Sequence, residues 1–99
     1  MAIDTAPSYI RLTIPRSELL ALLAEEASEL SQAALKLRRA EDGINPTPVP
    51  AATAAEHLIE EISDVVLVLQ ILKLEPDQDT IRRKLQRWVS RLRERREKE

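Results

Sequence analysis

Apolar residues recur at three- and four-residue steps along two long stretches of the chain. In residues 17–40, leucines and alanines keep to one side of a helix with 3.6 residues per turn. In residues 53–73 the apolar positions are denser, and they occupy nearly every side between Val65 and Leu72. This spacing is typical of helices that bury one face or, in the second stretch, most of their surface. The pattern predicts an all-α protein.

The first long helix is bounded by recognisable start and stop residues. Thr13 or Ser17 is expected to cap its beginning, with Pro15 tolerated in the first turn. Its end is expected shortly before Gly43, because glycine readily adopts the left-handed conformation that terminates helices. Residues 1–12 show no helical period, so we expect an extended or frayed lead-in there.

A proline-rich loop separates the two long helices. Prolines at alternate positions in residues 43–52 disfavour both a helix and a central strand. Thr53 and Glu56 then have the spacing of a capping box, which predicts the start of the second helix. This helix is expected to run to about Lys73.

A final, strongly basic helix is expected at the C-terminal end. Asp77 or Asp79 would cap it, the helix would begin near Thr80, and residues 93–99 would form a charged tail. Its apolar residues have helical spacing and are expected to form a core or interface stripe. They are Ile81, Leu85, Trp88 or Val89, and Leu92.

The length of 99 residues allows one domain, expected to be an antiparallel bundle of three to four helices. So few helices do not easily enclose a helix that is apolar on all sides. We therefore expect a homo-oligomer, at least a dimer, with the helix of residues 53–73 in a shared core. The alternative is a monomer whose other helices cover it.

Composition narrows the classes of protein further. The chain has no Cys, which excludes disulfides and zinc-thiolate sites, and no apolar run of membrane-spanning length. No secretory signal is visible, so we expect a cytoplasmic protein without membrane contact. The net charge is −2, but residues 82–99 hold nine basic and three acidic residues, a net +6, which leaves −8 for the rest. Nucleic-acid binding through this basic end is weakly supported, since the acidic remainder of the chain would repel phosphate backbones.

Two pairs of acids interrupt the apolar faces of the long helices. Glu26 and Glu29 lie on the apolar line of the first helix, and Glu61 and Asp64 on that of the second. In antiparallel helices the pairs would face each other, and four carboxylates would repel unless a cation joined them. Oxygen ligands favour Mg²⁺ or Mn²⁺, and Mg²⁺ commonly bridges to phosphates. A single E-x-x-E pair is often solvated surface, and the spacing alone leaves both interpretations open.

The stretches "EEASELSQAALKLRR" and "EEISDVVLVL", separated by a proline-containing loop, support a more specific hypothesis. They resemble the E-E-x-x-E … E-x-x-D signature of the MazG-like all-α nucleoside triphosphate pyrophosphohydrolases, over roughly residues 17–92. The resemblance implies Mg²⁺-dependent cleavage between the α and β phosphates, which yields a nucleoside monophosphate and pyrophosphate, and assembly as a homodimer or homotetramer. The implied metal ligands are Glu26, Glu29, Glu61 and Asp64, and Glu25 matches the first acid of the double Glu.

The resemblance also suggests roles for other residues. Glu25, or a Glu of the metal set such as Glu26 or Glu61, would orient the attacking water or accept its proton. Lys84 lies where many members have a basic residue, and Lys84 and Arg87 would contact phosphates, from a neighbouring chain if the site lies at a subunit boundary. The loop is longer than in compact members, and Arg82 replaces an Asn that is frequent in the family.

Two other functions are compatible with the residues. In the first, the chain is a non-catalytic interaction module whose basic last helix binds an acidic partner or nucleic acid. In the second, it is a relative of the pyrophosphohydrolases that binds nucleotides without turnover. The sequence leaves open the roles of Lys36, Asn45, His57 and Trp88, as well as the base and sugar of the substrate.

Overall fold

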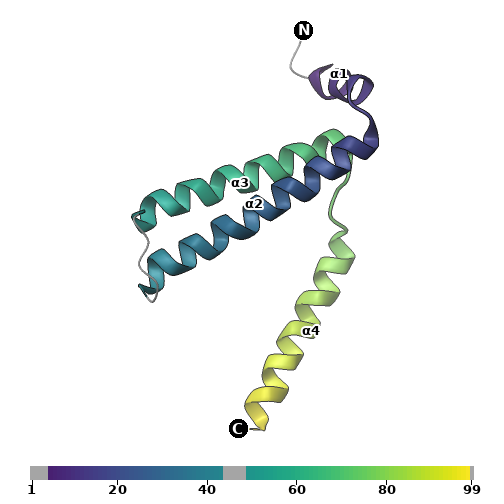
Figure 1. Ribbon diagram of the computed structural model, residues 1–99. Helices are drawn as coiled ribbons and strands as arrows, with labels where there is room; N and C mark the ends of the chain where they lie inside the picture. Colours follow the sequence, from purple (N-terminus) through teal and green to yellow (C-terminus); the bar gives the residue numbers. More distant parts are fainter. Residues whose placement is uncertain (1–4, 44–48, 99) are drawn as a thin grey trace.

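The computed structural model describes residues 5–43 and 49–98, and it is entirely helical there (Figure 1). The helices are α1 (Ala6–Thr13), α2 (Arg16–Asp42), α3 (Ala51–Leu72) and α4 (Gln78–Glu97). No strand occurs in the described residues, which confirms the all-α prediction. None of the described helices combines the length and the apolar character needed to cross a membrane.

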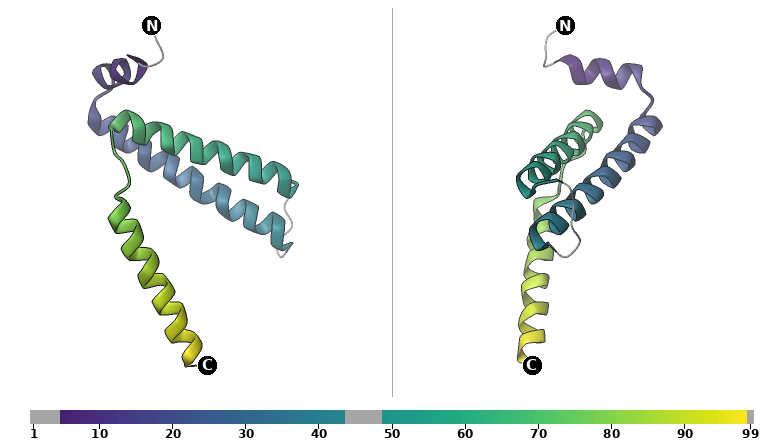
Figure 2. Two further views of the ribbon diagram at one scale, coloured as in Figure 1. Left: turned by 180° about the vertical axis from the view of Figure 1, so that it is seen from behind. Right: turned by 60° about the vertical axis from the view of Figure 1, so that its left-hand side comes forward.

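The two long helices form an antiparallel hairpin. In both figures α2 and α3 lie side by side, α1 sits at the end of the hairpin where α3 finishes, and α4 projects away (Figures 1 and 2). The radius of gyration is 18.2 Å, whereas a compact domain of this length would have about 13 Å. The four helices of the single chain therefore do not close into a bundle.

The core lies at the end of the hairpin where α1, the start of α2 and the end of α3 meet. Its buried side chains are Leu19, Val68, Ile71 and Leu72, against which Ile10, Ile14, Leu22 and Leu23 pack. Ala54, near the start of α3, is the other buried apolar residue in the described part of the chain. This small core fixes α1, α2 and α3 relative to one another.

Helix α1 replaces most of the extended lead-in expected for residues 1–12, so that prediction is wrong from Ala6 onward. A helix of eight residues is marginal alone, and tertiary contacts stabilise it. Ile10 and Ile14 pack on the core. The Arg11 guanidinium donates a hydrogen bond of 3.2 Å to the carbonyl oxygen of Ile71 in α3. These contacts are invisible in the local sequence pattern.

Both long helices begin directly after a proline. Pro15 precedes α2 and Pro50 precedes α3, each with φ −58°, and neither helix start has a side-chain capping hydrogen bond. The proline ring holds φ at this value, and the Pro15 and Pro50 carbonyls accept the first amide bonds of the two helices. The predicted cap at Thr13 or Ser17 is therefore wrong, and so is the predicted capping box of Thr53 with Glu56.

The remaining boundaries follow local chemistry. Gly43 ends α2 with φ 68°, as predicted. Asp77 caps α4 as one of the two expected residues, because its carboxylate accepts a 3.1 Å hydrogen bond from the Thr80 amide. Of the expected loop 43–52, residues 44–48 lie outside the described part, and residues 51 and 52 already belong to α3. Helix α4 extends through most of the expected charged tail.

Large apolar side chains of α3 and α4 remain exposed in the single chain. The apolar stripe of α4 was expected to lie in a core or an interface. It is exposed and does not belong to the core of the single chain, so the core prediction is wrong. The interface role stays a prediction. Trp88 is 65% exposed and Ile59 is 63% exposed. The other exposed members are Ile62, Val66 and Leu67 on α3 and Ile81, Leu85, Val89 and Leu92 on α4.

Candidate metal centre

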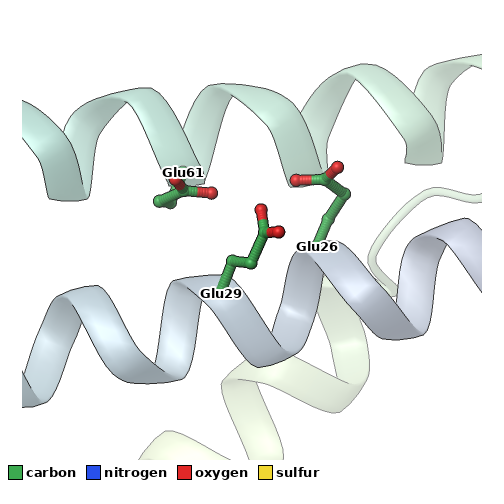
Figure 3. A group of neighbouring side chains, drawn as sticks. All are labelled: Glu26, Glu29 and Glu61. Atoms are coloured by element: carbon green, nitrogen blue, oxygen red, sulfur yellow. The ribbon is translucent and has the colours of Figure 1, made fainter.

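Three carboxylates meet in the space between α2 and α3. Glu26 and Glu29 come from α2 and Glu61 comes from α3, and each contributes a carboxylate oxygen to a group whose members lie within 4.8 Å of one another. Figure 3 shows the three side chains converging between the two ribbons. The separation suits ligands of one shared ion. The structure thus brings together three of the four acids expected to do so.

Helical spacing and the antiparallel pairing explain this convergence. Residues three apart lie on the same face, so Glu26 and Glu29 both point toward α3. Glu26 and Glu61 are partly buried by the contact between the helices, while Glu29 is more exposed. The acids therefore occupy positions that apolar residues would otherwise fill in a helix pair.

The fourth expected ligand, Asp64, lies at the margin of this group. Its side chain is exposed, and its oxygens are not among those within 4.8 Å. Its negative charge is nevertheless near enough to raise the pKa of both Glu26 and Glu61. Asp64 thus contributes to the field of the site without joining the close group.

The electrostatics of the close group are unfavourable without a cation. Burial is the main cause that raises the pKa of Glu26 and of Glu61, followed by the charges of Glu29 and Asp64. Oε2 of Glu26 and Oε2 of Glu61 are buried and have no hydrogen-bond partner among the described residues. Buried acceptors normally find a donor, because an unpaired one loses the hydrogen bonds that water supplied. A hard divalent cation would satisfy both oxygens, and an all-carboxylate set fits Mg²⁺ or Mn²⁺.

A pocket of about 530 Å³ opens beside the carboxylates between α2 and α3. Glu29 and Glu61 form part of its wall, and three basic side chains line it as well: Lys36 and Arg39 from α2 and His57 from α3. Gln32, Ala33, Ala54 and Glu60 complete the lining. The pocket is in the size range of small-ligand sites.

The sequence left Lys36 and His57 undecided and did not single out Arg39. Lys36 lies seven residues after Glu29, which is about two helical turns. Arg39 lies ten residues after Glu29, which is nearly three turns. This spacing would have been the signal for a shared face. Asn45, also left undecided, lies outside the described residues.

The other expected site residues lie apart from the close group. Glu25 is exposed and lines neither the carboxylate group nor its pocket. Lys84 and Arg87 line a separate hollow on α4, together with Thr80 and Arg83. Within one chain the structure does not bring α4 to the carboxylates, so phosphate contact by Lys84 and Arg87 stays a prediction.

Comparisons of the chain with family models, with curated proteins and with solved structures gave no match. The features of this chain that bear on its function are the three converging carboxylates, their two buried oxygens without a partner among the described residues, and the pocket beside them that is lined by both acidic and basic side chains.

Proposed function

We propose that this protein is a Mg²⁺-dependent nucleoside triphosphate pyrophosphohydrolase of the MazG-like type. The observation that carries the proposal is the meeting of Glu26, Glu29 and Glu61, with two buried carboxylate oxygens that lack a donor. If this helix pair had only a structural role, apolar side chains at these positions would stabilise the fold more than carboxylates do. The resemblance to the E-E-x-x-E … E-x-x-D signature supports the same assignment.

The proposed reaction is hydrolysis of the bond that links the α and β phosphates. Glu26, Glu29 and Glu61 would hold the ion, with Asp64 at the margin. A bound divalent cation would neutralise charge on the phosphates and on the departing pyrophosphate. Water would attack the α phosphorus, the bridging P–O bond would break, and Glu25 or a Glu of the set would accept the proton of the water. The products are a nucleoside monophosphate and pyrophosphate.

We also propose that the functional unit is a homodimer or homotetramer. The exposed apolar side chains of α3 and α4, together with a radius of gyration of 18.2 Å, support this proposal. Burial of these side chains against a second copy would supply the core that the single chain lacks. A neighbouring α4 would then bring Lys84 and Arg87 to the carboxylates.

One observation favours the alternative of a non-catalytic interaction module. Helix α4 is basic, projects from the hairpin and carries an exposed apolar stripe that includes Trp88. Such a helix would suit docking to an acidic partner. Turnover of nucleotides separates the two functions.

The test is an assay of purified protein with a panel of ribo- and deoxyribonucleoside triphosphates and Mg²⁺. Ion-exchange chromatography should detect a nucleoside monophosphate and pyrophosphate. Release of inorganic phosphate with a diphosphate would show that another bond is cleaved. Absence of turnover with every nucleotide, together with absence of Mg²⁺ and Mn²⁺ binding, would favour the interaction module.

Glu61→Gln tests the carboxylate group directly. The amide keeps the shape but removes one anionic ligand, so turnover should be abolished and Mg²⁺ should bind about a hundredfold more weakly or worse. Glu56→Gln is the matched control, because Glu56 is an exposed glutamate on the same helix and lies outside the pocket. Helicity and oligomer size should be unchanged in both variants. Retained turnover in Glu61→Gln would remove this residue from the site.

A further inference from the structure

Among the described residues, the basic side chains of the pocket have no ionic partner. Lys36, Arg39 and His57 share the pocket with Glu29, Glu60 and Glu61. The ion pairs among the described residues are Arg38 with Asp42 and Arg82 with Asp79, so none of the three basic groups lies within 4.0 Å of a carboxylate oxygen. Opposite charges thus line one pocket without neutralising each other.

Lys36 is the clearest case of an unpaired charge in this pocket. Its side chain is partly buried, whereas its neighbour Arg38 is exposed and pairs with Asp42 at 3.5 Å. The Nζ atom of Lys36 is not among the buried polar atoms without a partner in the described residues, so the alkyl stem accounts for the burial and the ammonium group is open to the pocket. No carboxylate pairs with Lys36 among the described residues. An anionic ligand in the pocket would therefore meet an unpaired positive charge.

The basic and the acidic side chains of the pocket are separated along the helix axis. At 1.5 Å per residue, Lys36 lies about 10 Å and Arg39 about 15 Å beyond Glu29 along α2. His57 precedes Glu61 by four residues, or about 6 Å, along α3. Because the helices are antiparallel, all three displacements point toward the end of the hairpin where α2 finishes and α3 begins (Figure 1). The pocket therefore has a carboxylate end and a basic end.

We infer that Lys36, Arg39 and His57 form an anion site that binds the pyrophosphate part of the substrate. This inference rests on the proposed function, and it adds an orientation. The terminal phosphates point toward the tip of the hairpin, and the nucleoside lies on the opposite side of the carboxylates. Arginine binds phosphate oxygens through its fork of donors, and lysine adds a compact charge. The carboxylates hold the cation, and the basic groups hold the anion that the reaction releases.

The experiment measures binding of radiolabelled inorganic pyrophosphate by equilibrium dialysis at constant free Mg²⁺. Lys36→Gln and Arg39→Gln should each weaken pyrophosphate binding about tenfold or more, which corresponds to about 1.4 kcal/mol. Binding of a nucleoside monophosphate and of Mg²⁺ alone should stay unchanged in both variants. Arg38→Gln is the matched control, since it removes an adjacent charge that does not line the pocket.

Two results would overturn the inference. One is wild-type pyrophosphate affinity in both Lys36→Gln and Arg39→Gln. The other is selective loss of nucleoside monophosphate binding, which would reverse the proposed orientation. Failure of the proposed function would give another result. No triphosphate would be cleaved and no Mg²⁺ would bind, yet the binding of pyrophosphate in EDTA would still be weakened by Lys36→Gln and Arg39→Gln. That result would retain the anion site without the enzyme. Circular dichroism confirms that each variant remains helical.

Discussion

Two identical substitutions on α3 distinguish a monomer from an oligomer that buries this helix. Ile71 is 5% exposed and belongs to the core, whereas Ile59 is 63% exposed in the single chain. Ile71→Ala and Ile59→Ala remove the same atoms from the same helix. Their difference in effect therefore reports burial, because the change in helix propensity is common to both.

The expected magnitudes follow from these exposures. Ile→Ala removes three carbons, worth about 2.4 kcal/mol when fully buried. At Ile71 a cavity adds to this loss, so the free energy of unfolding should fall by about 2–5 kcal/mol. At Ile59 in a monomer, the loss is about 0.9 kcal/mol and the better helix propensity of Ala offsets about 0.4, which leaves about 0.5 kcal/mol. If a second copy covers Ile59, the net loss rises to about 2 kcal/mol per subunit.

The assay is urea denaturation of the wild type and both variants, followed by far-ultraviolet circular dichroism. Subunit concentrations about a hundredfold apart reveal association, because the unfolding midpoint of an oligomer rises with concentration. Sedimentation equilibrium gives the mass of the native state. A monomeric wild type, together with an Ile59→Ala effect near 0.5 kcal/mol at both concentrations, would refute burial of this face of α3. An Ile71→Ala effect below about 1 kcal/mol would refute the assigned core.

Three further outcomes are expected. In EDTA, the melting temperature of the wild type should fall relative to that of Glu26→Gln as pH rises from 4.5 through the raised pKa of Glu26 and Glu61. Below this window the two groups are protonated in the folded state; above it their ionised forms are disfavoured by burial and by repulsion from Glu29 and Asp64. Mg²⁺ should remove that fall, and a difference that does not vary with pH would contradict the assigned burial and repulsion. Gly43→Ala should destabilise by about 1 kcal/mol in denaturation, from backbone strain alone, because φ is 68° and nothing lies within 4 Å of the added Cβ. Asp77→Ala should lower the helicity of α4 and remove about 1 kcal/mol, measured by the same method, and an unchanged signal would show that the cap to Thr80 is dispensable.

Much of the candidate site could be predicted because it depends on helical spacing. Glu26 and Glu29 were expected on the apolar side of one helix and Glu61 on that of another, and the structure brings them within 4.8 Å. The spacing did not distinguish Asp64, which lies at the margin. Whether the fourth acid joins the group depends on the register and separation of α2 and α3, which a single-helix pattern does not contain.

Helix starts and the short helix show the opposite case. The hydroxyl residues at the expected starts had suitable spacing, but Pro15 and Pro50 already hold the backbone in the geometry that leads into a helix. Helix α1 has too few residues to persist by propensity, and it depends on Ile10, Ile14 and the bond from Arg11 to α3. The hydrogen bond from Arg11 to Ile71 joins residues 60 positions apart, beyond any local pattern.

The sequence by itself determined the helical class, the glycine stop of α2, the aspartate cap of α4 and the acidic positions on two apolar faces. These features arise from interactions within a few residues, so the local order of side chains is sufficient to specify them. Only the tertiary structure decided that α4 leaves the hairpin, that three of the acids meet, and that Lys36, Arg39 and His57 share a pocket with them. These features depend on how one helix packs against another, and that packing is set by the combined burial of side chains distant in the chain.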